Sequence, residues 1–488
     1  MLKAQVGWNS AFFRIHSSIF LFLFFGCCSN TYAQATMEAD IRPGISGSYP
    51  NNFAEYNGKL YFKANDGISG DELWSFDGSM ATLVADIQSG PSNSAPYGMT
   101  EYDGKLYFSA LNDSVGFELW SFDGSTTTLT ADVNPSGSYW PGSLTTFNNK
   151  LFFSGKDGTN GFELWSYDGS VFSMEADIIV GSAGSYPAYL TEYDGKLFFQ
   201  AESIGSGMEL WSYNGNTAVL EAEIRQGLAS SNPKDLTVYN GKLYFQASDG
   251  TFGQELWSYD GNIAVLEADI LPGISGSEPW GLTVFNDKLY FSANDFINGT
   301  ELWSFDGTNA TLEFDIVPGS GGSSPQYLAE YGGRLYFQAT NNTYGIELWN
   351  FYNATATLVA DIRPGVANSI PRSLIVYNNK LYFRADDGIS GKELWSYTDP
   401  TIGIEETLPQ NKILVLPNPT TGQVQIDLGS TIQDYSLHVF NSIGALVDSQ
   451  QLKHAQYFAY ELPEAKGIYV IQLVGLNGAF RTTRVIKE

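Results

Sequence analysis

The sequence predicts an all-β protein made of an eight-bladed β-propeller followed by a small C-terminal β-sandwich. The first reason is a repeat with a period of about 46 residues, which is typical of propellers and solenoids. The second is that each period contains four short runs of aromatic and β-branched residues, separated by Gly, Asn, Asp and Pro, as expected for four strands. The repeat is marked by Glu-Leu-Trp, which begins at Glu72, Glu118, Glu163, Glu209, Glu255, Glu301, Glu347 and Glu393.

Composition excludes several classes of function. The 488 residues include 25 Lys plus Arg against 53 Asp plus Glu, a net charge of −28, and such a field repels nucleic acid. The cysteines are Cys27 and Cys28, and the histidines are His16, His438 and His454. Residues 36–406 contain neither type, so a zinc site with His or Cys ligands, a Ser-His-Asp triad and a Cys-His pair are excluded there.

Residues 1–35 are predicted to be a signal peptide. Lys3 and Arg14 precede or flank an apolar run, Ile19 to Phe25, and Ala33-Gln34-Ala35 provides small residues for cleavage. The run is too short to span a bilayer, so we expect no transmembrane anchor in the mature chain. A retained anchor and a lipoprotein signal at Gly26-Cys27 are the alternatives.

Residues 36–401 hold the repeats. In the first complete unit the predicted strands are 53–56, 59–64, 72–76 and 82–87. Asn57-Gly58 and Asp77-Gly78 are expected to form two-residue turns, because these pairs tolerate the positive φ angles of tight hairpins. Each unit is then two hairpins in one antiparallel sheet, and its two apolar faces require neighbours on both sides, as in radially stacked blades.

Strand counting predicts how the ring closes. The Glu-Leu-Trp strand and the run ending in Asp-Ile each occur eight times, yet Glu393 to Tyr397 has no such run after it. The surplus run is the first, Met37 to Ile41. We therefore expect this N-terminal strand to become the outer strand of the last blade, whereas an open solenoid would leave it unpaired.

The repeat also predicts two different faces. The two hairpin turns of each blade lie at one face, and the Gly-rich loops, such as 65–70 and 42–50, lie at the other. Long loops on a rigid scaffold commonly carry function, so we expect binding at the long-loop face.

The motifs Gly-Lys-Leu-Tyr-Phe, Asp-Gly-x-x-Gly and Glu-Leu-Trp-Ser-Tyr-Asp-Gly resemble the ELWxxDGT repeat family of secreted bacterial proteins. The likeness covers about three quarters of the chain and departs at Phe351-Tyr352-Asn353 and Tyr397-Thr398, where the terminal Asp-Gly is lost. It implies a propeller-like surface protein and assigns no chemistry to particular residues.

The tail follows a predicted linker, 402–410. Short alternating strands in 411–488 predict a small β-sandwich. Its Asn418-Pro419-Thr420-Thr421-Gly422 opening, Gly467-Ile468-Tyr469-Val470 and basic last strand resemble the C-terminal sorting domain of type IX secretion. The resemblance implies contact with the type IX machinery and a secreted or outer-surface location in a Gram-negative, Bacteroidetes-like bacterium, with the domain removed or used for attachment.

Candidate binding residues come from the long loops. The eight Glu-Leu-Trp tryptophans are expected to pack between blades, since they occupy equivalent strand positions. Other aromatic residues of the loops are candidates for a rim that stacks sugar rings, the alternative being loop residues folded onto the blade edge: Tyr49, Tyr97, Tyr139, Trp140, Tyr186 and Trp280. Lys234, Arg363 and Arg372 are candidates for contact with an anionic polymer, or else solvated loop residues.

Acidic residues recur in each unit, as Asp40, Asp66 and Glu72 do in the first. Such oxygen-rich loops suit calcium, the one cofactor considered, although Asp also caps loops by bonding its own backbone. No catalytic residue is assigned. We expect a non-enzymatic secreted or cell-surface propeller that binds a glycan, matrix or surface ligand. The alternative is a polysaccharide hydrolase or lyase that uses carboxylates or Tyr on the same face.

Overall fold

The computed structural model describes residues 35–134 and 137–399 and much of the C-terminal part: residues 414–416, 420, 423–432, 435–441, 445–452, 455–463, 466–475 and 480–487. The predicted signal peptide, apart from Ala35, and the predicted linker lie outside the described residues. Within the described ranges, no helix has the length and apolar character needed to cross a bilayer.

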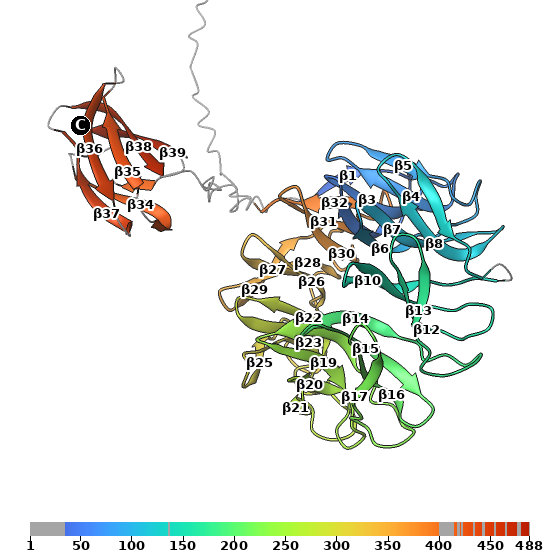
Figure 1. The fold of residues 1–488 in the computed structure, drawn as a ribbon. Coiled ribbons are helices and arrows are strands. Elements are labelled where there is room, and N and C mark those ends of the chain that lie inside the picture. Colours follow the sequence, from blue (N-terminus) through green and yellow to red (C-terminus); the bar gives the residue numbers. More distant parts are fainter. Residues whose placement is uncertain are drawn as a thin grey trace, which may run out of the picture. The chain divides into compact units, whose positions relative to one another are not determined.

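Eight four-stranded antiparallel sheets follow one another along the chain, and they are the predicted blades (Figure 1). The innermost strands of blades 1 to 8 are β2 (Asn51–Tyr56), β6 (Tyr97–Tyr102), β10 (Gly142–Phe147), β14 (Ala188–Tyr193), β18 (Lys234–Tyr239), β22 (Trp280–Phe285), β26 (Gln326–Tyr331) and β30 (Arg372–Tyr377). The second strands are β3 (Lys59–Asn65), β7 (Lys105–Asn112), β11 (Lys150–Gly155), β15 (Lys196–Ser203), β19 (Lys242–Ala247), β23 (Lys288–Asn294), β27 (Arg334–Ala339) and β31 (Lys380–Asp386).

The third strands carry the Glu-Leu-Trp motif. They are β4 (Asp71–Phe76), β8 (Gly116–Phe122), β12 (Glu163–Tyr167), β16 (Gly207–Tyr213), β20 (Glu255–Tyr259), β24 (Thr300–Phe305), β28 (Glu347–Tyr352) and β32 (Lys392–Tyr397). The outer strands are β5 (Ala81–Ala85), β9 (Thr127–Ala131), β13 (Phe172–Ala176), β17 (Ala218–Ala222), β21 (Ala264–Ala268), β25 (Ala310–Phe314), β29 (Thr355–Ala360) and β1 (Thr36–Ala39).

The ring closes as predicted, through the N-terminal strand. Each innermost strand contacts the innermost strand of the next blade, and β30 of blade 8 contacts β2 of blade 1. β1 pairs antiparallel with β32 as the outer strand of blade 8. Within it, Glu38 accepts from Lys380 Nζ (2.7 Å) and Ser396 Oγ (2.5 Å). Glu221 has the same partners in blade 4, so β1 reproduces the bonding of an ordinary outer strand.

The core of the propeller lies between the blades. Its eight hydrophobic clusters each combine side chains of two neighbouring blades; for example, Tyr61 and Leu73 of blade 1 pack with Leu106 and Phe108 of blade 2. The cluster that joins blades 8 and 1 includes Trp74. The Glu-Leu-Trp tryptophans therefore belong to the packing between blades, as predicted.

The turns correct one detail of the sequence prediction. Asn57-Gly58 is a two-residue turn with φ of 48° and 69°, as a type I′ hairpin requires. Asp77-Gly78, in contrast, belongs to a four-residue loop, 77–80, because the Asp77 carboxylate accepts the N–H groups of Ser79 and Met80. In blade 7 the sequence departs from Asp-Gly, and Asn353-Ala354 forms the turn with both φ values positive.

The two faces of the ring are those that the sequence predicts. At the short-turn face, the 77–80 loop lies next to Asn378 in the β30–β31 turn of the preceding blade. At the long-loop face, the loop between β3 and β4 meets the link between blades 1 and 2, where the Asp71 N–H donates to Asn93 Oδ1 (2.7 Å).

The C-terminal part forms two sheets. One has the order β33-β34-β37 and the other β36-β35-β38-β39. Their strands are β33 (Leu414–Leu416), β34 (Gln423–Ile432), β35 (Tyr435–Phe440), β36 (Leu446–Leu452), β37 (Ala455–Glu461), β38 (Gly467–Gly475) and β39 (Phe480–Lys487). Ile426 of the first sheet and Leu437 and Ile471 of the second share one hydrophobic core, which is the arrangement of a small β-sandwich.

Candidate functional site

The glutamate of each Glu-Leu-Trp motif is fully buried and holds the long-loop face together. In blade 1, Glu72 accepts hydrogen bonds from Ser94 Oγ (2.6 Å), Ser94 N (2.9 Å), Ile87 N (2.8 Å) and Gln88 N (3.4 Å). These donors lie in the link to blade 2. Burial raises the pKa of Glu72 to about 7, although the hydrogen bonds from Ser94 and Ile87 lower it.

The same buried Glu–Ser bond recurs in six further blades. The other pairs are Glu163–Ser185, Glu209–Ser231, Glu255–Ser277, Glu301–Ser323, Glu347–Ser369 and Glu393–Ser48. Because all eight glutamates have no exposed surface, a substrate cannot reach them. These recurring carboxylates therefore position loops, and they are not catalytic groups.

Blade 2 departs from this pattern at Tyr139, which takes the place of the serine. Glu118 Oε1 accepts the Tyr139 N–H (2.9 Å), but Glu118 Oε2 and the Tyr139 hydroxyl are buried without a protein partner. The Tyr139 ring fits because Gly155 stands where the other blades have Ala, and a Cβ there would come within 2.9 Å of the ring. Tyr139 has no exposed surface, so its placement in an aromatic rim was wrong.

The recurring loop aspartates cap their own loops. Asp66 Oδ1 accepts the N–H groups of Ile68 (2.8 Å) and Ser69 (2.7 Å). Burial opposes the ionisation of Asp66, but these hydrogen bonds outweigh it and lower its pKa. Among the described residues, no three Asp, Glu, His or Cys side chains come together as a metal site.

Three predicted rim residues share one backbone position. Tyr49, Trp140 and Tyr186 each lie in the blade-linking loops just before a proline, with φ between 52° and 57°. One face of each is covered by the residue that precedes a Glu-Leu-Trp motif. Trp140 stacks on Phe117 with centroids 4.2 Å apart, and Lys392 Nζ lies 4.9 Å from the Tyr49 ring. These side chains remain partly exposed at the long-loop face.

Four other predicted residues share a second position, the first residue of an innermost strand: Tyr97, Lys234, Trp280 and Arg372. Each faces a cross-strand neighbour on the second strand; Lys234 pairs with Gln246 and Trp280 with Ser292. The repeat thus brings these residues of different blades to one level of the inner strands, at the long-loop end.

Trp280 lines a pocket of about 420 Å³ at this level, in blades 5 to 7. Trp280 is 46 % exposed, and Phe296, which is also exposed, contributes a second ring. Gln246 lines the same pocket with only 6 % of its surface exposed, and its buried Oε1 has no protein partner. Trp280 also borders a second hollow of about 380 Å³ with Tyr189 and Tyr327. Gln246 and Phe296 were not predicted; glutamine also occupies the cross-strand position of Gln246 at Gln200 and Gln338, so alignment of the repeats would not have distinguished it.

Arg363 is engaged within the protein. Its Nη1 lies 3.5 Å from Asp386 Oδ2, and its guanidinium covers Gly388, where a Cβ would be 2.8 Å from Nε. Arg42 and Arg225 cover Gly67 and Gly250 in the same way. The structure therefore places Arg363 among loop-supporting arginines, apart from Trp280.

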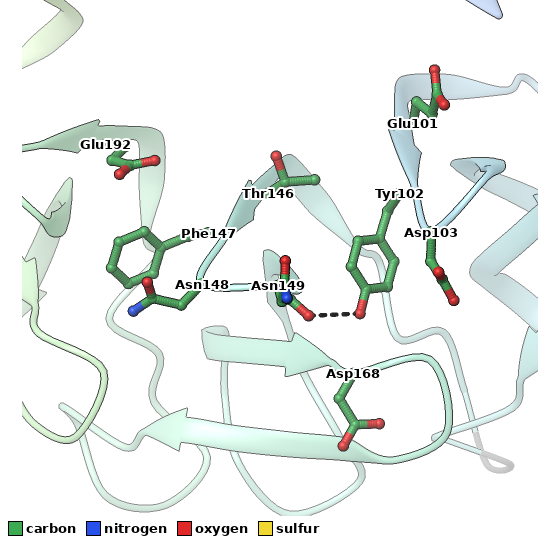
Figure 2. Close-up of a pocket in the computed structure, with 9 residues that line it drawn as sticks. All are labelled: Glu101, Tyr102, Asp103, Thr146, Phe147, Asn148, Asn149, Asp168 and Glu192. Atoms are coloured by element: carbon green, nitrogen blue, oxygen red, sulfur yellow. Dashed lines mark hydrogen bonds between the residues drawn. The ribbon is translucent and has the colours of Figure 1, made fainter.

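A hollow of about 750 Å³ lies at the short-turn face, where no site was predicted (Figure 2). Glu101 and Glu192 lie on either side of Thr146, and Asp103 and Asp168 complete the acidic lining. Tyr102 Oη donates to the Asn149 carbonyl (2.8 Å). Asp168 is already bound by the N–H groups of Val171 and Ser170, which lower its pKa.

Solved structures similar to this chain include peptidases and a lectin. A prolyl endopeptidase is 11 % identical, with 78 % of this chain and 54 % of that chain covered and a TM-score of 0.42. A Mycobacterium tuberculosis puromycin-hydrolyzing peptidase is 9 % identical, with 72 % and 61 % covered and a TM-score of 0.43. The SapL1 lectin in complex with alpha methyl fucoside is 12 % identical, with 56 % and 97 % covered and a TM-score of 0.30. The chain thus spans about half the length of the prolyl endopeptidase, and at these TM-scores none of the likenesses carries a functional argument.

Sequence comparison assigns the C-terminal part. A search of curated proteins found no matching sequence. Residues 414–488, however, match the family model of the secretion system C-terminal sorting domain. The match confirms the predicted sorting domain, and the protein is an eight-bladed propeller that a type IX secretion system carries to the cell surface or beyond in a Bacteroidetes-type bacterium.

Proposed function

We propose that this protein is a non-enzymatic carbohydrate-binding propeller of the cell exterior, and that it binds its ligand at the long-loop face. The observation that carries the proposal is the Trp280 pocket, in which the exposed side chains of Trp280 and Phe296 lie beside the amide side chains of Asn294 and Gln326. The likeness of the repeats to the ELWxxDGT family of secreted proteins agrees with this role.

The lining of the Trp280 pocket suits a sugar ring. A sugar has a C–H face that packs on an aromatic ring and hydroxyl groups that need donors and acceptors. Trp280 and Phe296 supply aromatic surface, whereas Gln246, Asn294 and Gln326 supply amides that both donate and accept. The volume of about 420 Å³ lies within the range of small-molecule sites, roughly 300–1,000 Å³.

The same lining favours binding over hydrolysis. Glycoside hydrolysis generally needs two carboxyl groups that flank the bond to be cleaved. Among the described residues that line this pocket, Glu278 is the one carboxylate. The Glu-Leu-Trp glutamates cannot supply the second, because they are fully buried in hydrogen bonds to the loops.

A glycan array with the full-length secreted protein, followed by calorimetric titration of the glycans that bind, tests the proposal. Covering about 60 Å² of indole at ~25 cal/mol per Å² contributes about 1.5 kcal/mol, so Trp280→Ala should raise Kd roughly tenfold. Trp140→Ala is the matched control, since Trp140 stacks on Phe117 outside this pocket and its loss should leave Kd unchanged. Equal Kd values for wild type and Trp280→Ala would refute the site. Release of reducing ends from a bound glycan would refute the non-enzymatic role.

A further inference from the structure

Trp280 belongs to a set of eight cross-strand residue pairs, one per blade, at the long-loop end of the inner strands. We call this set the belt. Each pair joins the first residue of an innermost strand to its neighbour on the second strand. From blade 1 to blade 8 the pairs are Asn51/Lys63, Tyr97/Ser109, Gly142/Ser154, Ala188/Gln200, Lys234/Gln246, Trp280/Ser292, Gln326/Gln338 and Arg372/Arg384. Four residues of the belt pairs in blades 5 to 7 line the Trp280 pocket: Gln246, Trp280, Ser292 and Gln326. Blade 8 is the next blade in the ring after blade 7.

In blade 8 this belt pair consists of two arginines. Like charges directly opposite one another on adjacent strands are destabilising. Neither guanidinium forms an ion pair or a side-chain hydrogen bond with a described residue, and the Nε atoms of both are buried without a partner. Burial is the main cause of the lowered pKa of Arg384, and the positive charge of Arg372 lowers it further. In the structure as it stands, the pair is thus an uncompensated concentration of positive charge.

Eight other cations of the described residues form ion pairs, whereas the partly buried Arg225, Lys234 and Lys392 form none with a described residue. The ion pairs of the described residues are Lys63–Asp71, Lys150–Glu175, Lys196–Glu221, Lys242–Glu267, Lys288–Glu313, Arg334–Asp399, Arg363–Asp386 and Lys380–Glu38. With 53 acidic residues against 25 basic ones, the chain has carboxylates in excess. Among the eight belt pairs, that of blade 8 is the one in which two cations oppose each other across adjacent strands, and neither has a carboxylate partner among the described residues.

The groups around the pair are suited to an anion. The Arg372 guanidinium lies 5.8 Å from the Tyr327 ring centroid, and Tyr327 borders the same hollow as Trp280. Lys392, which lies on β32 beside the strand of Arg384, adds a positive charge at this end of blade 8, and its Nζ stands 4.9 Å from the Tyr49 ring centroid. Guanidinium groups bind oxyanions through planar pairs of N–H donors, which a lysine cannot do.

We propose that Arg372 and Arg384 form an oxyanion subsite at the long-loop face and bind a carboxylate or sulfate group carried by a polysaccharide. The polysaccharide part of this inference rests on the proposed carbohydrate-binding function, and it names the charge class of the ligand. The oxyanion part stands on the arginine pair itself. A bound oxyanion accepts from the Nη donors and offsets the repulsion between the two guanidinium groups.

The experiment titrates full-length protein with dextran sulfate, polygalacturonate and neutral dextran at fixed ionic strength, and separately measures the melting temperature with inorganic sulfate. The variants are Arg372→Gln and Arg384→Gln. Arg225→Gln is the matched control, because it removes one positive charge from an arginine that covers Gly250 on the same face.

The inference predicts that each variant of the pair binds the preferred anionic polymer at least tenfold more weakly than wild type, as expected for loss of a charge-assisted hydrogen bond. Arg225→Gln should bind it as wild type does. Arg384→Gln should also melt at a higher temperature than wild type without anion, because the repulsion is gone, and sulfate should stabilise it less. A purely structural role for the arginines predicts the opposite change in melting temperature.

Comparison of the two polymers identifies the group: preference for polygalacturonate indicates a carboxylate, and preference for dextran sulfate a sulfate. Wild-type affinity for the anionic polymers in both pair variants, or an equal loss in Arg225→Gln, would overturn the inference. If only the proposed carbohydrate site at Trp280 is wrong, Trp280→Ala should bind glycans as wild type does, while the arginine variants still bind the anionic polymer more weakly.

Discussion

The buried Glu–Ser bond makes a quantitative prediction for Ser94→Ala. The substitution removes the Ser94 Oγ donor from Glu72 Oε2 and leaves Ile87 N as its partner there. Hydrogen bonds to charged groups contribute about 1.5–3 kcal/mol, and those between neutral groups about 1 kcal/mol. We therefore expect a loss of about 2 kcal/mol where Glu72 is ionised and about 1 kcal/mol where it is protonated.

The pH dependence follows from the pKa of Glu72. Burial raises it to about 7, and the hydrogen bond from Ser94 lowers it, so removal of that bond raises it further. The variant should thus lose more at pH 8, where wild-type Glu72 carries its charge, than at pH 5.

Native-state hydrogen exchange of residues 86–96 at pH 5 and pH 8, converted to opening free energies, measures this loss where it occurs. Local opening is the appropriate quantity because repeat arrays need not unfold in one step. Ser75→Ala is the control: Ser75 Oγ bonds Thr82 Oγ1 (3.1 Å), a neutral pair, so its cost should not change with pH. A cost for Ser94→Ala that is equal at both pH values, or larger at pH 5, would refute the reasoning.

Three further predictions concern the whole ring. The pKa of buried glutamates such as Glu72 and Glu393 is raised to about 7, so their contribution to stability is complete below pH 4.5 and is lost as the pH rises through about 7. The urea midpoint of the wild type should therefore fall between pH 5 and pH 8, and a rising midpoint would contradict this. In blade 2, we expect Gly155→Ala to lower the free energy of unfolding in urea by about 1–3 kcal/mol and Tyr139→Ser to lower it by about 3–5 kcal/mol. The double variant should lose less than the sum of the two, because the methyl group added at position 155 then fills space that the Tyr139 ring has left. Deletion of residues 36–41 should accelerate hydrogen exchange in β32 and lower the melting temperature, whereas unchanged melting would show that β1 does not close the ring.

The sequence was sufficient for the ring because its pattern is both periodic and countable. The surplus Met37–Ile41 run predicts the closing strand, and β1 pairs with β32 as this count requires. The two-residue Asp77-Gly78 turn was wrong for a physical reason: an aspartate can bind two N–H groups beyond itself, and a four-residue loop then becomes the better turn.

The site was less predictable because it depends on which residues the repeat brings to one level. Tyr139 resembles Tyr49 in the printed sequence, yet a shift of one residue along the loop places it in the core. Gln246 and Arg384 lie on second strands, and each directly follows a Leu-Tyr-Phe run that is typical of an ordinary core strand. Only their cross-strand register with Lys234 and Arg372 shows that they belong to the belt.

Hydrogen exchange of the wild-type protein with and without a saturating glycan tests most directly where the ligand binds. The account predicts protection in residues 275–300 and 324–328, which surround Trp280, with no change at the short turns. Protection confined to residues 101–103 and 146–149, which line the acidic hollow of Figure 2, would contradict it and move the binding site to the opposite face.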